Sequence, residues 1–340
     1  MTSGIVNLST GPVGITTQVL NALKEPPVSH RSAEFIKLYN RTTSLLSNEF
    51  NVKQTYLLTG SGTLANEVML QEIKHLRGKG LILSNGEFGR RLVDQSTRNN
   101  INFDKYDIAW GASFDLNEVE KKIIDSSAAW ILFCHSETST GVINKLDEIS
   151  AIAKRNKCLC FVDCMSTAGT MPIDLSEVTM ASASSGKGLA CVPGLAIIFS
   201  NISPSLKSDS PVYLDLGYYA QTGIPFTLSS NLVKALLVSV LQKLTQSQYD
   251  LLQFYRAEIF SVLNQYNFVP FSNADSKVFT LVNAGYANNL TGQLKKKQLL
   301  LSSESEYLKT RGWTQLATFG YYTEKQLKYV LKCLAESCAN

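Results

Sequence analysis

Apolar residues along the chain gather in short continuous runs that are separated by stretches with helical spacing. The runs lie at residues 55–58, 81–83, 128–133, 159–162, 178–181 and 194–199. Between them apolar residues recur roughly once per turn, as at Leu64, Val68, Ile73 and Leu76, which is typical of helices with one buried face. Continuous apolar strands that alternate with helices indicate a mostly parallel sheet covered on both faces. The pattern therefore predicts an α/β fold.

The last third of the chain has a different pattern. A long helical pattern covers residues 230–260, and strand-like runs at 279–282 and 316–321 are followed by a helical stretch at 324–336. This mixture predicts a small α+β C-terminal domain. At 340 residues the chain exceeds the ~250–300 residues that a single core usually serves. We therefore expect an N-terminal arm (1–20), a large domain (21–228), and a long connecting helix with a small domain (229–340).

Composition narrows the classes of function. With 44% apolar and 18% charged residues and a net charge of +4, the chain is typical of a globular protein and gives no reason to expect nucleic acid or a membrane surface as a partner. Three histidines argue against a His-rich metal site, so no metal is expected. The start of the chain shows no secretory signal, and no apolar run approaches the ~20 residues of a membrane span. We expect a cytoplasmic protein.

Seven cysteines are present, and none belongs to a repeated C-x-x-C pattern. Cys158, Cys160 and Cys164 lie close enough together to suggest zinc. The first two, however, alternate along an apolar run, as buried strand residues do. Reduced, packed thiols are therefore expected rather than metal ligands or disulfides.

A glycine-containing turn, Gly60-Ser61-Gly62-Thr63, lies between the first apolar run and a helical stretch. Free backbone N–H groups and the positive end of the helix dipole favour an anion at such a turn. The alternative is a plain helix start capped by Ser61 or Thr63. A dinucleotide fingerprint is excluded because Asn66 stands where the third glycine belongs, and a Walker A loop would need G-K-[ST].

Polar residues also follow the other predicted strands, at 84–89, at 135–141 and at Asp163. Open α/β sheets bind ligands at the carboxyl ends of their strands. These groups are therefore expected to converge on one crevice.

Lys187 stands in a run of small residues between the last two apolar runs. Most lysines in loops are simply solvated. A partly desolvated lysine instead has a depressed pKa and becomes a nucleophile toward an aldehyde cofactor. Taken by itself, the loop leaves both interpretations open.

Seven stretches taken together are more specific. They are Gly11-Pro12, His30-Arg31-Ser32, Gly60-Ser61-Gly62-Thr63, Asn85-Gly86-Glu87-Phe88-Gly89, His135-Ser136-Glu137-Thr138-Ser139-Thr140-Gly141-Val142, Val162-Asp163, and Lys187 with Pro193-Gly194. In content and order they resemble the class V aminotransferases of the fold-type I pyridoxal-phosphate enzymes, and within them the alanine–glyoxylate aminotransferase and 2-aminoethylphosphonate transaminase branch. The resemblance covers about the first two-thirds of the chain. It implies a seven-stranded-type sheet and pyridoxal 5'-phosphate as cofactor.

The resemblance also implies roles for individual residues. Lys187 forms the Schiff base with the cofactor aldehyde and later moves the Cα proton, and Asp163 pairs with the pyridinium nitrogen. Phe88 stacks on the ring, for which an ordinary core phenylalanine is the alternative, and Thr138 bonds near the ring hydroxyl. The phosphate is held by Ser61, Gly62 and Thr63. Gly11 lies on the substrate side.

The family completes its site across a dimer interface. Tyr219-Ala220-Gln221-Thr222 resembles the Tyr-x-x-Thr with which the neighbouring subunit reaches the phosphate. A homodimer with shared active sites is therefore implied, with Tyr219 and Thr222 as cofactor ligands.

Two positions depart from the family pattern. Gly186 replaces the usual Gln or Asn before the lysine, and Ser184 or Ser185 is expected to substitute. Gln315 stands where relatives carry the arginine that binds the substrate carboxylate, although an amide cannot form that charged, bidentate clamp. Arg311 and Arg31 are the candidate replacements.

Three functions follow. The first is an aminotransferase that moves an amino group from an amine or amino acid donor to a keto acid or aldehyde through a pyridoxamine intermediate. The second keeps the cofactor but performs a lyase, replacement or condensation reaction on an atypical amine, and the missing arginine motivates it. The third is a non-catalytic relative, and the retention of Lys187, Asp163 and the phosphate turn argues against it.

Overall fold

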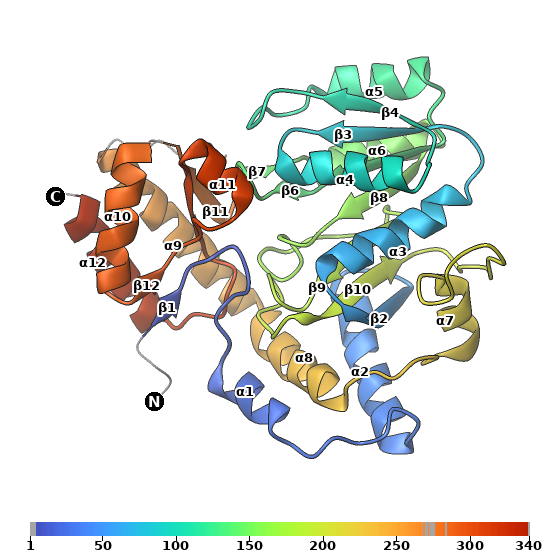
Figure 1. The fold of residues 1–340 in the computed structure, drawn as a ribbon, viewed down its shortest axis with the longest axis horizontal. Helices are drawn as coiled ribbons and strands as arrows, with labels where there is room; N and C mark the ends of the chain where they lie inside the picture. Colours follow the sequence, from blue (N-terminus) through green and yellow to red (C-terminus); the bar gives the residue numbers. More distant parts are fainter. Residues whose placement is uncertain (1–4, 267, 269–270, 272–275, 283, 339–340) are drawn as a thin grey trace.

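A seven-stranded sheet organises the larger part of the molecule (Figure 1). The structure is a computed structural model that describes residues 5–266, 268, 271, 276–282 and 284–338; residues 1–4 of the expected arm lie outside this range. In spatial order the strands are β2 (Gln54–Gly60), β10 (Gly194–Ser200), β9 (Met180–Ser184), β8 (Leu159–Asp163), β5 (Trp130–Cys134), β3 (Gly80–Ser84) and β4 (Phe103–Asp107). β10 is antiparallel to both its neighbours, and the other four pairings are parallel. The predicted α/β fold with a mostly parallel sheet is confirmed.

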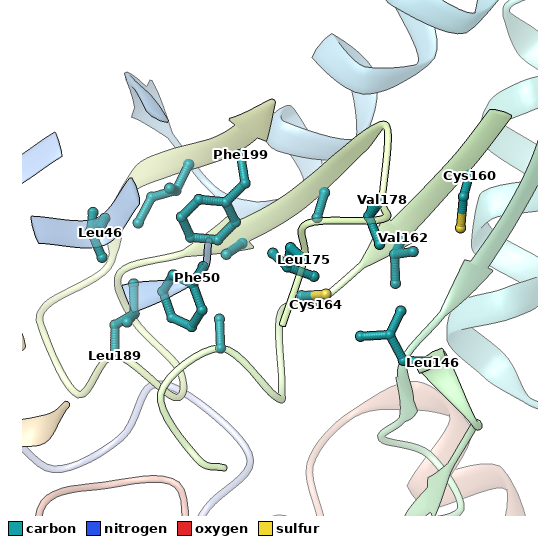
Figure 2. Close-up of a cluster of buried hydrophobic side chains, with 14 of the residues drawn as sticks. Leu46, Phe50, Leu146, Cys160, Val162, Cys164, Leu175, Val178, Leu189 and Phe199 are labelled. Carbon is teal, nitrogen blue, oxygen red and sulfur yellow. The ribbon is translucent and has the colours of Figure 1, made fainter. Parts of the chain in front are cut away.

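Helices cover both faces of this sheet, as its continuous apolar strands require. One face carries α1 (Thr17–Leu23), α2 (Ala33–Glu49), α5 (Leu116–Asp125), α6 (Leu146–Arg155) and α8 (Ser230–Lys243). The other carries α3 (Gly62–Lys74), α4 (Glu87–Arg98) and α7 (Leu216–Thr222). Strand residues alternate between the two cores: Leu57 belongs to the first and Leu58 to the second. Figure 2 shows part of the first core, where the rings of Phe50 and Phe199 lie 4.7 Å apart.

The C-terminal part of the chain builds a smaller body with a core of its own. It contains α9 (Gln246–Gln265), β11 (Val278–Leu281), α10 (Ala284–Lys296), β12 (Leu299–Leu300), α11 (Glu306–Arg311), β13 (Thr314–Ala317) and α12 (Glu324–Cys338). The N-terminal arm joins this body through β1 (Val6–Asn7), which pairs with β12. Figure 1 shows the arm in blue, running from the small body to α1. The boundaries 1–20, 21–228 and 229–340 remain a proposal for the domains.

The expected single helix over 230–260 is wrong, because α8 and α9 are separate. The break lies at Leu244 and Thr245, and the Thr245 side chain accepts a hydrogen bond from the backbone N–H of Gln248. A threonine that caps a new helix competes with continuation of the previous one. Apolar spacing continues across the break, so hydrophobic periodicity does not reveal it.

The strands place their polar ends together. β2, β3, β5, β8 and β9 all run in one direction, so their carboxyl ends lie at one edge of the sheet. Asp163 ends β8 and Ser184 ends β9. A short hairpin of β6 (Ser136–Glu137) and β7 (Val142–Ile143) follows β5 and lies beside the small body in Figure 1.

Among the helices of the described part of the chain, none combines the length and the apolar character that crossing a bilayer would demand.

Lys243 connects the two bodies from a fully buried position. It is the last residue of α8, and its Nζ donates a hydrogen bond of 2.6 Å to the carbonyl oxygen of Gly320. Burial, together with the nearby charge of Lys277, lowers the pKa of Lys243 to about 7. The folded protein therefore disfavours the charged form of this amine.

We expect Lys243 to make the free energy of unfolding rise between about pH 7 and pH 10.5. In this range the unfolded chain keeps the proton that the folded chain has lost, since the ordinary pKa is 10.5, and stability rises with pH wherever the unfolded state binds more protons. Urea unfolding at a series of pH values will measure how the free energy of unfolding changes with pH. Lys243→Met should remove this part of the slope, and Lys234→Met, at a partly exposed lysine of the same helix, should keep it. Equal slopes in all three proteins would contradict the assignment.

Candidate active site

Two cavities meet at the carboxyl edge of the sheet. The first, of about 390 Å³, is lined by the starts of α3 and α4 and the ends of β8 and β9; we call it the sheet-side cavity. The second, of about 510 Å³, is lined by residues 7 and 9–12 of the arm and by residues 300–305 and Tyr307 of the small body; we call it the arm-side cavity. Phe88, Arg91 and Lys187 line both. The two cavities therefore share one wall.

Lys187 lies in the loop between β9 and β10, and its side chain is half-buried. Its Nζ lies 3.4 Å from the hydroxyl of Ser166 and 4.9 Å from the centre of the Phe88 ring. Burial lowers the pKa of Lys187, and the negative charge of Asp163 opposes that shift. The interpretation as a solvated loop lysine is therefore wrong. The amine is held in a cavity, and it loses its proton more readily there than a free lysine does in water.

Gly11 explains how the arm approaches this lysine. Its φ is +136°, and a Cβ at that position would lie 3.3 Å from Cγ of Lys187. A side chain there would be both strained and crowded. Gly11 lines the arm-side cavity, and because it has no side chain the backbone of the arm can pass close to Lys187.

Asp163 is fixed at the end of β8. Its Oδ2 accepts a hydrogen bond of 2.9 Å from the side-chain amide of Asn66, and its Oδ1 accepts one of 2.9 Å from the backbone N–H of Met165. The Ser182 hydroxyl in turn donates a hydrogen bond of 2.6 Å to the side-chain oxygen, Oδ1, of Asn66. Burial raises the pKa of Asp163, and the bond from Asn66 counteracts it. Both carboxylate oxygens are thus held in place.

Asn66 is a residue whose role the sequence did not reveal, since it served only to exclude a dinucleotide fingerprint. It follows Gly62 by four positions on α3, so both lie on one helix face. The spacing of four residues is thus a feature of the sequence that indicates that Asn66 lies on the same side of α3 as the glycine turn. Gly62 itself lies against Met165, because an added Cβ would come within 2.5 Å of the Met165 sulfur.

The start of α3 carries no side-chain cap. Ser61 occupies the N-cap position, but its hydroxyl makes no capping hydrogen bond. Both Ser61 and Thr63 are exposed. Thr63 and its neighbour Gly62 line the sheet-side cavity. The alternative of a helix start capped by Ser61 is therefore not what the structure shows. The first N–H groups of the helix are left for another acceptor.

The two serines that were expected to compensate for Gly186 differ in position. Ser184 lines the sheet-side cavity. Ser185 is completely buried, where its hydroxyl donates to the carbonyl of Val192 at 2.6 Å and accepts from the N–H of Leu195 at 3.2 Å. Ser185 therefore closes the lysine loop rather than facing the cavity.

Phe88 is positioned by a buried carboxylate. Glu137 accepts hydrogen bonds from the backbone N–H groups of Phe88, at 3.2 Å, and Gly89, at 2.9 Å, at the start of α4. The Ser139 hydroxyl also donates to it, at 2.5 Å. Burial raises the pKa of Glu137, although these bonds favour its charged form. The Glu137 carboxylate thus fixes the helix start that carries the Phe88 ring.

Thr138 is also buried beside the lysine. Its hydroxyl shares a hydrogen bond of 2.5 Å with the hydroxyl of Ser166, which accepts the bond from Lys187. Ser166 is a second residue that the sequence did not single out.

Gln315 does not reach either cavity. It is completely buried on β13, and its Nε2 donates to the carbonyl oxygens of Thr138, at 2.5 Å, and Ser139, at 3.1 Å. It also donates to the hydroxyl of Thr280, and its Oε1 accepts from the hydroxyl of Tyr307. The amide thus ties the small body to the loop after β6.

The two candidate replacement arginines also lie elsewhere. Arg311 stacks on Trp110, with 3.7 Å between its guanidinium carbon and the ring centre. Arg31 is exposed just before α2. Neither lines the two cavities. The guanidinium that does so is Arg91, which the sequence did not single out because an exposed arginine on a helix ordinarily faces solvent.

Tyr219 and Thr222 remain apart from Lys187 within one chain. The Tyr219 hydroxyl donates to the carbonyl of Tyr213 at 3.1 Å, and that of Thr222 to the carbonyl of Tyr218 at 2.6 Å. Neither lines the two cavities.

A larger cavity, of about 660 Å³, lies between the end of α2, the start of α6 and residues 171–174. Its charged groups are mainly carboxylates, and its Lys145 is exposed beside Glu148. Burial lowers the pKa of its histidine, His135, to about 4. It therefore lacks the desolvated amine that distinguishes the Lys187 cleft.

Comparison with known proteins agrees with this cleft. The family model of the class V aminotransferases matches residues 16–209, more than half of the chain. The chain therefore belongs to the class V aminotransferases, and the resemblance read from the motifs is confirmed.

Individual relatives fall in the same class. An uncharacterized aminotransferase of Methanocaldococcus jannaschii is 32% identical over 68% of this chain and 63% of its own length. A 2-aminoethylphosphonate–pyruvate transaminase of Pseudomonas putida is 32% identical over 54% of this chain and 53% of its own. The chain thus spans less than two thirds of either curated relative.

A solved structure extends the likeness in fold to nearly the whole chain. An aspartate aminotransferase from Thermus thermophilus superposes with a TM-score of 0.89 over 98% of this chain and 99% of its own, at 22% identity. At that identity the likeness concerns the fold.

We expect Gln315→Leu to lower the free energy of unfolding by about 1–3 kcal/mol, because it leaves buried carbonyl and hydroxyl groups without a partner. Urea unfolding measures the change. Gln293→Leu is the control, and it should change stability little. Among the residues that the structure describes, the Gln293 side-chain amide donates one hydrogen bond, to Asn289 at the surface of the same body. A Gln315→Leu protein as stable as the wild type would contradict a tethering role.

Proposed function

We propose that this class V aminotransferase binds pyridoxal 5'-phosphate in the sheet-side cavity and transfers an amino group from an amine or amino acid to a keto acid or aldehyde. One observation carries the proposal. The amine of Lys187, with its lowered pKa, lies in the same cavity as the buried carboxylate of Asp163 and an uncapped helix start. An amine, a carboxylate and an anion cradle match the aldehyde, the ring nitrogen and the phosphate of that cofactor.

In this proposal each part of the cofactor has its own protein partner. The phosphate is held by the N–H groups at the start of α3 with Ser61, Gly62, Thr63 and Ser184, since an anion is favoured at a helix N-terminus. Phe88 contacts the ring face and Thr138 the ring hydroxyl. When bound, the cofactor supplies an aldehyde and an electron-withdrawing ring, which the protein alone lacks.

Asp163 has the electrostatic role. A carboxylate that is buried in this way is costly unless a positive group stands against it. Because Asn66 and Met165 hold both its oxygens, it cannot turn away from the cavity. With the cofactor bound, it would stabilise a proton on the ring nitrogen, and that proton would keep the ring electron-withdrawing.

Lys187 has two roles. Its amine would hold the cofactor aldehyde, and the same amine would take the proton from the substrate carbon and return it. A general base works best when its pKa lies near the working pH, and burial moves the pKa of Lys187 in that direction. Ser166, within 3.4 Å, orients the amine.

The rest of the functional expectation also stays a proposal. We propose a homodimer in which Tyr219 and Thr222 reach the partner's cofactor, on the strength of the family resemblance. All seven cysteines are free thiols, which supports a reducing compartment such as the cytoplasm.

The second candidate keeps the cofactor and ends in elimination, replacement or condensation. The observation that favours it is Gln315, which is sealed behind Thr138 and Ser139 where the family carries its carboxylate-binding arginine. A substrate without that clamp is free to differ from an ordinary amino acid.

We expect the purified protein to take up pyridoxal phosphate and turn yellow, with a borohydride-sensitive absorption band. Reduction and peptide mass analysis should locate the cofactor on Lys187. Lys187→Ala should lose the covalent product, and Lys157→Ala, at an exposed lysine, should keep it. A wild type that binds no cofactor would overturn both candidates.

A panel of donors then separates the two. Because one curated relative is a 2-aminoethylphosphonate–pyruvate transaminase, the panel should include that amine beside amino acids. Conversion of the bound cofactor to its pyridoxamine form, reversed by a keto acid, supports amino transfer. Release of ammonia or of a side-chain fragment without that conversion supports the second candidate.

We expect the rate at which the cofactor-free protein takes up pyridoxal phosphate to rise with pH to a plateau whose midpoint lies below 10.5, the ordinary lysine value. The neutral amine is the reactive form, and a lowered pKa makes it available at lower pH. Stopped-flow absorbance across a pH series measures the midpoint. A midpoint at or above that of free lysine would show that burial does not depress the pKa.

A further inference from the structure

Two consecutive arginines near the start of α4 face in different directions. The Arg90 guanidinium lies 5.2 Å from the centre of the Trp110 ring and 3.7 Å from a carboxylate oxygen of Asp107. Arg91 lies 4.9 Å from the centre of the Phe88 ring and lines both the sheet-side and the arm-side cavity. Only the second arginine belongs to the active-site cleft.

Arg91 keeps most of its hydrogen-bonding capacity. Among the described residues its guanidinium donates one hydrogen bond, from Nε to the Glu87 carboxylate at 3.0 Å. The two terminal nitrogens, which form the fork that binds a carboxylate, make no hydrogen bond to the described protein atoms. The side chain is 53% exposed, and an exposed ion pair one helical turn apart contributes little to stability. The guanidinium is therefore available to a ligand.

Two cations line the cleft, Arg91 and Lys187, together with the carboxylates of Asp94, Asp163 and Glu304. An anion in the cleft is therefore attracted by the Arg91 guanidinium itself and not by an overall positive lining. Each of the two cations lies 4.9 Å from the centre of the same Phe88 ring, so they are at most twice that distance apart. A molecule that reacts at Lys187 can therefore reach Arg91 with a group only a few bonds from its reacting carbon.

The other three residues that the sequence suggested for binding the substrate carboxylate do not line the cleft. Gln315 is sealed in a hydrogen-bond network, and Arg311 is stacked on Trp110. Arg31 is exposed outside both cavities.

We propose that Arg91 binds the carboxylate of the substrate through its two terminal nitrogens, so that the substrates are short amino acids and keto acids whose acid group lies within a few bonds of the reacting carbon. The inference rests on the proposed function, which it deepens. Glu87 keeps its bond to Nε and holds the guanidinium in the cleft. Specificity then comes from α4 rather than from β13.

The cofactor phosphate presents the same anionic chemistry. The position of Arg91 argues against the phosphate as its ligand. Arg91 extends into the arm-side cavity, whereas the proposed phosphate site at Gly62 and Thr63 lines the sheet-side cavity and not the arm-side one. The experiment below separates the two.

The test measures acetate binding to the holoenzyme by calorimetry, with neutral acetamide as the uncharged probe. Wild type should prefer acetate. Arg91→Gln should weaken acetate binding about tenfold or more and leave acetamide unchanged, and Arg91→Lys should restore part of the loss as a point charge without the fork. Arg90→Gln is the matched control and should behave as wild type. Equal acetate binding in wild type and Arg91→Gln would overturn the proposal.

Cofactor affinity, measured by absorbance titration, provides the second arm. It should be equal in wild type and Arg91→Gln. If Arg91→Gln loses cofactor affinity while acetate binding is unchanged, Arg91 serves the phosphate and the proposal is wrong. If wild type takes up no cofactor, the proposed function fails, and acetate binding to the cofactor-free protein still decides the role of Arg91. Because Arg91 is exposed, unfolding curves of Arg91→Gln and Arg90→Gln should coincide.

Discussion

The register of the central sheet is the constraint on which the cleft depends. Asp163 pairs with Cys134 on one side and with Ser182 on the other, and Ser182 supports the Asn66 amide that holds the Asp163 carboxylate. Side chains alternate between the faces of a strand, so a slip of one residue would exchange Asp163 for a neighbour that faces the opposite core. Val162 is such a neighbour, and it packs in the first core (Figure 2). Packing of apolar side chains on both faces therefore fixes where the carboxylate points.

The loop after β5 connects that sheet to the small body. Glu137 holds the start of α4, while the carbonyls of Thr138 and Ser139 accept hydrogen bonds from Gln315. The Thr280 hydroxyl also donates to Ser139. These groups are buried, where an unpaired polar group is costly. The ring of Phe88 and the position of the small body are thus set by one network, which explains why polar residues fill this buried loop.

The parts of the fold that could be predicted were those that depend on local pattern. Continuous apolar runs predicted six of the seven strands of the sheet, whereas β4 has no such run. A glycine turn predicted the start of α3 but left open whether a side chain caps it. The break between α8 and α9 was missed because apolar spacing continues through it and a capping threonine decides it. Arg91 was missed for a different reason: a charged residue in an amphipathic helix has the same pattern whether it faces solvent or a cavity. Asn66 became informative only once the sheet had placed it beside Asp163.

The place of the guanidinium affects what the cleft selects. An arginine on a strand of the small body is held by the sheet, and its approach to the substrate depends on how the two bodies sit. An arginine on α4 follows Phe88 on one helix, so its position relative to Lys187 is set within the large body. Four side-chain torsions and 53% exposure make it adaptable and keep it partly hydrated, which weakens each charged hydrogen bond relative to a buried one. Such a clamp discriminates by the presence of an acid group more than by its orientation, and it leaves the walls of the arm-side cavity to select the rest of the substrate.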